Sequence, residues 1–158
     1  MKIKRSRLDW ALEALALAAL IAAYSIAARY WNHIHTPVYR FRPAGVFLPW
    51  TAKSGLQILL LINTGTYALL TFAGAYQKII NVPLEIDRDA PQVKQLLMRM
   101  MIVLKAIVMV LSLYLIWATV NVGLGHGRSL PGTYLVVFAL LVALPLILYT
   151  GKLRQYRK

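Results

Sequence analysis

The chain has 158 residues, of which 59% are hydrophobic, and its mean hydropathy is +0.61. This apolar share exceeds that of an ordinary globular domain and indicates an integral membrane protein. The formal net charge is +13, but the cations concentrate beside apolar segments at the two ends of the chain, so we expect no nucleic-acid partner. Cysteine is absent, which excludes disulfides, thiolate metal sites and cysteine nucleophiles.

Four segments are long and apolar enough to cross a bilayer, which takes about 20 residues. They run approximately over residues 10–30, 55–76, 96–122 and 133–150. We predict an all-α integral membrane fold, a four-transmembrane-helix bundle that forms a single domain over residues 1–158. The first apolar run exceeds the ~7–15-residue core of a signal peptide, so we expect it to be retained as a spanning helix.

The distribution of cations predicts the orientation of these helices, because lysine and arginine are enriched in cytoplasmic segments. The two termini and the second loop together hold more cations than the first and third loops. We therefore predict a multi-pass protein of the bacterial inner membrane with both termini in the cytoplasm.

Within the first helix, Glu13 lies about one turn inside the bilayer, where an unpaired carboxylate is costly. Lys105 lies at a similar depth on the third helix, and Arg99 precedes it on the same helix. We predict that Glu13 pairs with Lys105 or Arg99 as a structural tie between the helices. A proton-transfer site is the alternative, although a single carboxylate does not make a proton path.

The histidines all map to outer helix ends, since His33 and His35 follow the first helix and His126 follows the third. Imidazole commonly ligates metals and haem, so a haem, pigment or metal site is one hypothesis for them. No carboxylate is nearby in the sequence to orient a ligating ring, which favours ordinary interfacial histidines. We therefore predict no metal and no cofactor, with haem or pigment as the weaker alternative.

The first outer loop, "RFRPAGVFLPWTAK", carries cations, prolines and a tryptophan but no carboxylate. Such a surface favours anionic partners, which are either lipid headgroups or acidic residues of another subunit. The residues that we assign to this interaction are Arg40, Arg42, Trp50, Lys53 and, in the second outer loop, Arg128.

The second helix carries a stripe of polar and small residues, which are Asn63, Tyr67, Thr71 and Gly74. Their intervals of four, four and three place them on one side of the helix. In lipid such stripes pack helices through close approach and hydrogen bonds. We predict packing within this chain, with packing against another subunit or a substrate path as alternatives.

The third helix is preceded by Asp89, Ala90 and Pro91. Aspartate is a favoured N-cap residue and proline is favoured in the first helical turn. We therefore predict that Asp89 caps this helix.

The first loop resembles the signature of a bacterial membrane domain of unknown function found in relatives of the Sdp immunity protein. That pattern runs roughly His-Phe-Asn-x-x-Gly-x-Pro-Asp-x-Trp-x-x-Lys, and this chain matches it at Phe41, Gly45, Trp50 and Lys53. A second block, "NVPLEIDRDAPQVKQLLMRMMIVLK", is similar to the family's asparagine-x-proline segment and following helix. The residues matched there are Asn81, Pro83, Arg99, Leu104 and Lys105, and the resemblance covers about residues 30–125.

The chain departs from the family pattern at its polar positions. Arg40, Arg42, Phe47 and Leu48 stand where the family has His, Asn, Pro and Asp. The resemblance therefore implies a shared scaffold whose polar loop chemistry, including any handling of protons or cations, is lost in this chain.

Function is predicted from these patterns together. No nucleophile with a base, no paired carboxylates and no metal cluster are visible in the sequence, so we expect no enzyme. We predict a non-catalytic accessory or scaffold subunit of a larger bacterial membrane complex, which binds partner subunits and anionic phospholipid. The alternative that the resemblance implies is an immunity or signalling protein that senses or blocks a toxin. The sequence predicts no oligomeric state.

Overall fold

The computed structural model describes residues 5–34, 38–41, 48–76, 90–126 and 133–156. Four helices dominate it, namely α1 (Arg7–Tyr30), α2 (Ala52–Ala75), α3 (Pro91–Gly123) and α4 (Thr133–Leu153). The short 3₁₀ helices η1 (Trp31–His33) and η3 (Arg154–Tyr156) continue α1 and α4. All four long helices are long and apolar enough to cross a membrane, so the prediction of an all-α fold with four candidate spans is confirmed.

The helix boundaries differ from the predicted spans most at α3, which begins at Pro91 rather than near Leu96. The predicted span was taken from the apolar run that begins near Leu96, whereas the residues before it include Gln92, Lys94 and Gln95. Ala90 is the N-cap residue and makes no side-chain capping bond, and Asp89, which was predicted to cap this helix, lies outside the described residues. Ala90 is extended, with φ −59° and ψ 127°, since the ring of Pro91 disfavours helical backbone in the preceding residue.

The segment between α1 and α2 contains a small hairpin that was not predicted from the sequence. Strand β1 (Val38–Phe41) pairs antiparallel with β2 (Leu48–Thr51), so that Val38 lies opposite Thr51 and Phe41 opposite Leu48. Both strands are short, and Pro49 in β2 has no backbone N–H to donate. Both features make a strand hard to predict from the sequence. In a two-stranded hairpin each strand is an edge, where proline is tolerated.

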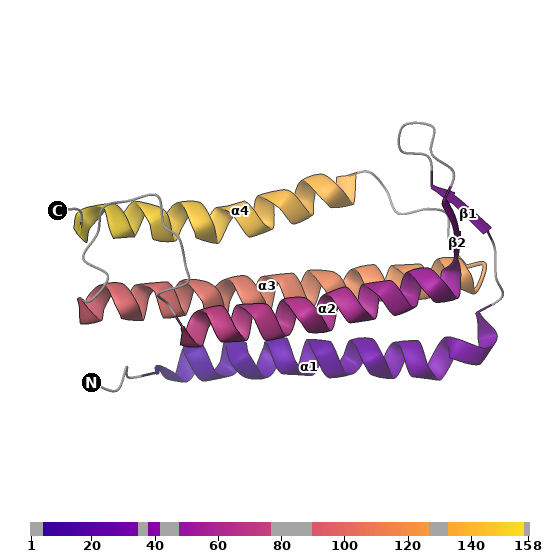
Figure 1. Ribbon diagram of the computed structural model, residues 1–158, viewed down its shortest axis with the longest axis horizontal. Coiled ribbons are helices and arrows are strands. Elements are labelled where there is room, and N and C mark those ends of the chain that lie inside the picture. Colours follow the sequence, from indigo (N-terminus) through magenta and orange to yellow (C-terminus); the bar gives the residue numbers. More distant parts are fainter. Residues whose placement is uncertain (1–4, 35–37, 42–47, 77–89, 127–132, 157–158) are drawn as a thin grey trace.

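Helix α3 is the centre of the arrangement and packs against α1, α2 and α4 (Figure 1). Helices α1 and α2 contact each other less extensively than either contacts α3. The beginning of α1 and the end of α4 lie at the same end of the molecule, which we call the terminus end (Figure 1). The hairpin lies at the opposite end, which we call the hairpin end.

Small residues let α1 approach α3 closely. Its buried apolar residues are Ala16, Ala19, Ala23 and Ala27, each at most 4% exposed. Their spacing of three, four and four places them on one side of the helix. Alanine loses no side-chain entropy on packing, so this stripe provides helix contact at little entropic cost in a lipid environment.

The core consists of three apolar clusters that follow one another along the bundle. The hairpin-end cluster is formed by Ala23, Ala27, Ile34, Leu56, Ile116 and Val120. The middle cluster is formed by Ala16, Ala19, Ala106 and Met109. The terminus-end cluster is formed by Val93, Leu97, Met100, Met101 and Leu153.

Backbone groups at two helix ends are satisfied by local hydrogen bonds. At the start of α1, the Ser6 N–H donates to the Asp9 carboxylate at 2.7 Å, and the Asp9 N–H donates to the Ser6 hydroxyl at 3.1 Å. This reciprocal pair is a capping box. At the end of α3, Gly125 has φ +80°, and the His126 N–H donates to the Asn121 carbonyl at 3.0 Å. Glycine suits this left-handed position because it has no Cβ.

Candidate functional site

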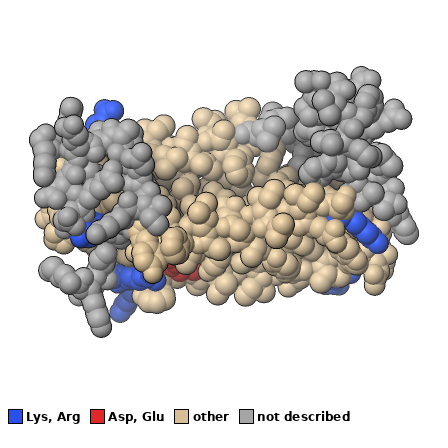
Figure 2. Space-filling model, viewed as in Figure 1, with Lys and Arg blue, Asp and Glu red and all other residues tan. Residues whose placement is uncertain are grey.

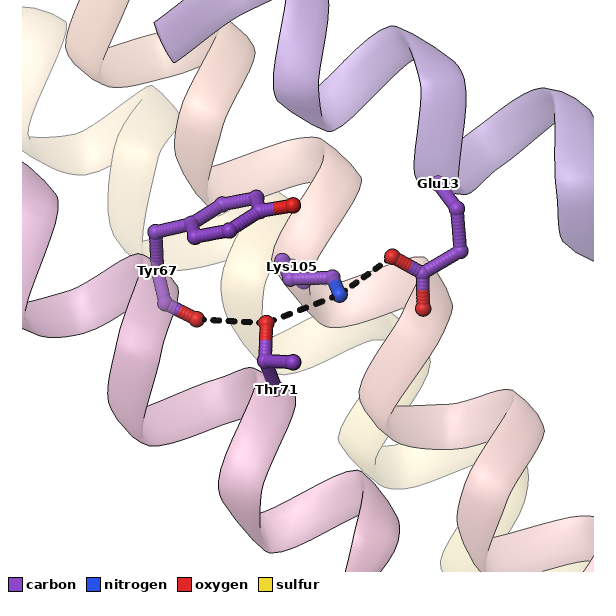
Figure 3. A network of polar contacts seen from close by, with 4 residues as sticks. All are labelled: Glu13, Tyr67, Thr71 and Lys105. Atoms are coloured by element: carbon purple, nitrogen blue, oxygen red, sulfur yellow. Dashed lines mark hydrogen bonds and ion pairs between the residues drawn. The ribbon is translucent and has the colours of Figure 1, made fainter.

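Polar side chains from three helices meet inside the bundle towards its terminus end. Lys105 of α3 is 1% exposed and forms an ion pair with Glu13 of α1. Its ammonium also donates to the Thr71 hydroxyl of α2 at 3.1 Å and lies 5.0 Å from the centre of the Tyr67 ring. Figure 3 shows Lys105 between the carboxylate and the hydroxyl, with the tyrosine ring beside it. We call Glu13, Tyr67, Thr71 and Lys105 the polar cluster.

The geometry of the polar cluster suits a buried cation. Glu13 balances the charge of Lys105, and the Tyr67 ring presents its electron-rich surface to the ammonium. The Thr71 hydroxyl donates to the Tyr67 carbonyl at 2.7 Å, so its lone pairs remain available to accept from Lys105. A charge buried among apolar helices needs this pairing, because an isolated one is costly to remove from water.

A second ion pair lies closer to the terminus end. The Arg99 Nε atom is 3.6 Å from the Asp9 carboxylate, which is longer than a hydrogen bond, and Asp9 is buried. Of the two partners predicted for Glu13, Lys105 forms the ion pair and Arg99 pairs with Asp9 instead. Asp9 was not predicted as a partner, although the spacing Ser6-x-x-Asp9 is that of a capping box and Asp9 stands one turn before Glu13.

The predicted stripe on α2 faces α3 over most of its length. Tyr67 and Thr71 contact Lys105, and a Cβ placed on Gly74 would lie 3.5 Å from the Cβ of Met101. Asn63 is 2% exposed and therefore also points into the bundle. The stripe lies at a packing surface within this chain.

The two histidines that the structure describes lie at the hairpin end. His33 ends η1 and is exposed, and His126 follows the C-terminal turn of α3 and is also exposed. His35 lies outside the described residues. Within the described ranges, no three His, Cys, Asp or Glu residues are placed to hold a metal ion.

The cationic loop is described only in part. Arg40 lies in β1 and Trp50 lies in β2, while Arg42 and Arg128 lie outside the described residues. The Lys53 ammonium lies 5.6 Å from the centre of the Trp31 ring, so it sits against η1 at the hairpin end.

The arrangement can fix three helices relative to one another. Lys105 joins α3 to α1 through Glu13 and to α2 through Thr71, although α1 and α2 themselves touch less. Comparison with known protein families, with curated proteins and with solved structures finds no match to the chain. The proposals below therefore rest on the residues of this chain.

Proposed function

We propose that this chain is a non-catalytic accessory subunit of a larger complex in the bacterial inner membrane. The observation that carries the proposal is a mismatch in α2. Of the four candidate spans, that of α2 is the least apolar and also the least buried. Only 6% of its most apolar stretch is buried, against 44% for α3. A helix that faces lipid over most of its surface is expected to be the most apolar.

The exposed surface of α2 has features suited to contact with another transmembrane helix. Thr64, Gly65 and Ala68 are exposed there, and a Cβ on Gly65 would meet nothing within 4 Å. Small residues such as Gly65 and Ala68 let helix backbones approach closely in lipid, whereas the Thr64 hydroxyl is already bonded within the chain to Tyr24 of α1 at 2.6 Å and to the Leu60 carbonyl at 2.9 Å. We infer that a transmembrane helix of a partner protein packs on this surface.

Charge supports the orientation and the lipid contacts that we propose. Figure 2 shows lysine and arginine near both ends of the molecule and an uncharged band between them. The described cations at the terminus end are Arg5, Arg7, Lys94, Arg99, Lys152 and Arg154. We propose that this end is cytoplasmic and contacts anionic phospholipid, because cations are enriched on that side of membranes. Arg5 over Trp10 and Lys152 over Tyr149 combine the charged and aromatic groups that suit an interface.

Site-specific photo-crosslinking in the native membrane tests the proposal. A photoreactive amino acid replaces Leu69, which is 65% exposed on α2 one turn from Gly65. The matched control position is Ile147, which is 68% exposed on α4. We expect Leu69 to crosslink to one defined membrane protein and Ile147 to crosslink to lipid.

Two results would contradict the accessory role. Crosslinks to lipid alone from both positions would mean that no partner covers α2. A crosslink from Leu69 to a second copy of this chain would replace the proposed partner with a homo-oligomer.

A toxin-immunity role is the second candidate, and the hairpin is the observation that favours it. The segment that resembles the Sdp immunity relatives includes β1 and β2, at the end of the molecule opposite the termini. In the orientation proposed above that end faces outward, where a secreted toxin arrives. Deleting the gene should then sensitise cells to such a toxin, and unchanged sensitivity would remove this candidate.

A further inference from the structure

Asn63 of α2 is a polar side chain buried in the bundle. Asn63 is 2% exposed, and neither the nitrogen nor the oxygen of its side-chain amide has a hydrogen-bond partner in the described parts of the chain. An amide buried in an apolar bundle loses its hydrogen bonds to water and is strongly destabilised unless they are replaced. This position therefore needs both a donor and an acceptor from another source.

The position of Asn63 connects it to the polar cluster. Asn63 stands one helical turn from Tyr67 and two turns from Thr71 on the same side of α2. Side chains on a helix lean towards its N-terminus, so Tyr67 leans towards the turn that carries Asn63. Its ring in turn lies against Lys105. Polar groups therefore continue from Lys105 along α2 to Asn63.

The polar cluster is partly exposed through Glu13, and apolar residues bound it towards the hairpin end. The Glu13 side chain is 19% exposed, and Arg99 near the terminus end is 40% exposed. Beyond Asn63 towards the hairpin end, the next α2 residues on this side are Leu59, Leu60 and Leu56, which belong to or pack on the hairpin-end cluster. That cluster also contains Ile116 and Val120 of α3, so the polar path ends there.

We propose that water enters the bundle from the terminus end, hydrates the polar cluster and binds the Asn63 amide as its innermost site. Water supplies the donor and the acceptor that the amide requires, and buried waters typically bind such groups with two to four hydrogen bonds. The hairpin-end cluster stops this water before it crosses the bundle. The proposal is independent of whether a partner covers α2.

Solid-state NMR of the whole chain in lipid bilayers tests the binding of water. The chain is labelled with ¹⁵N at its asparagine side-chain amides, which belong to Asn32, Asn63, Asn81 and Asn121, and magnetisation transferred from mobile water is recorded. An N63L variant assigns the signal of Asn63. We expect the Asn63 signal to receive magnetisation from water. The signal of Asn32, which is exposed, is the positive control. Loss of the transfer at Asn63 alone would show a dry amide and overturn the proposal.

Thiol labelling tests the one-sided access, and the absence of native cysteine makes single-cysteine variants simple to prepare. The variants are Asn63→Cys and, as the control in the hairpin-end cluster, Leu56→Cys. A small charged thiol reagent is added to either side of sealed vesicles. We expect Asn63→Cys to react from the terminus side on the order of tenfold faster than Leu56→Cys, because thiolates form only in hydrated surroundings. Equal rates for the two variants, or labelling of Asn63→Cys from the hairpin side, would contradict the closure.

Discussion

At the scale of single residues, the ion pair between Glu13 and Lys105 is the feature that the sequence located best. The prediction needed only the depth of each charge in its helix and the cost of leaving either one unpaired in lipid. The pair of Asp9 and Arg99 was missed because Asp9 was not considered as a partner. The isolation of Asn63 was also beyond the sequence, since a stripe on one helix does not reveal whether a neighbouring helix offers a matching donor or acceptor.

Replacing Lys105 with Met tests the contribution of the ion pair. The change leaves the Glu13 carboxylate without its cation, so we expect the free energy of unfolding to fall by about 3 kcal/mol. Unfolding is measured by titrating the protein in mixed micelles with a denaturing detergent.

The double variant Lys105→Met with Glu13→Gln is the control, because it removes both charges together. We expect it to recover much of the lost stability, since the remaining groups carry no unbalanced charge. Unchanged stability in the single variant, or in Glu13→Gln alone, would show that the pair is no structural tie.

At the scale of elements, the long helices were predictable because each needs only an apolar run of sufficient length. Their ends needed other signals, since the start of α3 at Pro91 follows from the preference of proline for the first helical turn, whereas the apolar run alone begins near Leu96. The hairpin was missed because each of its strands has four residues and one contains Pro49. Short elements of this kind depend on pairing between strands, which local sequence specifies weakly.

The alanine stripe of α1 gives a prediction about helix packing. Ala19→Leu inserts a larger side chain where α1 meets α3, so we expect a loss of about 1–3 kcal/mol through overpacking. Ala18→Leu is the matched change at an exposed position of the same helix. Detergent titration of both variants should find a large loss of unfolding free energy only for Ala19→Leu. Equal losses would mean that the stripe does not form the packing surface.

The capping box of α1 gives a smaller effect. Ser6→Ala removes the hydroxyl that accepts from the Asp9 N–H, so we expect a loss of about 1 kcal/mol. Ser6→Asp keeps an acceptor at the N-cap and should restore most of this stability. The same unfolding titration measures both, and an identical result for the two variants would mean that the cap contributes nothing.

At the scale of the whole molecule, one helix is surrounded and three are peripheral. This arrangement explains why α3 is the most buried helix, and it leaves α2 with polar and small residues on its outer surface. The sequence predicted the stripe on α2 that faces inward, but it did not indicate how much of that helix remains uncovered. That quantity depends on where α4 packs, and α4 lies against α3.

The orientation of the molecule gives a prediction for intact cells. Cysteines placed at Ser6 and Tyr156 should react with a membrane-impermeant thiol reagent only after the membrane is opened, because we propose that the terminus end is cytoplasmic. A cysteine at His126, at the hairpin end, should react in intact cells. Reaction at all three positions in sealed cells, or the reverse pattern, would contradict the proposed orientation.

The accessory role is tested most directly by purifying the chain from its native membrane in a gentle detergent and weighing the intact assembly by native mass spectrometry. We expect an assembly that contains this chain and at least one different membrane protein in a fixed ratio, held through the surface of α2. A chain that purifies alone, with only lipid bound, would contradict the accessory role.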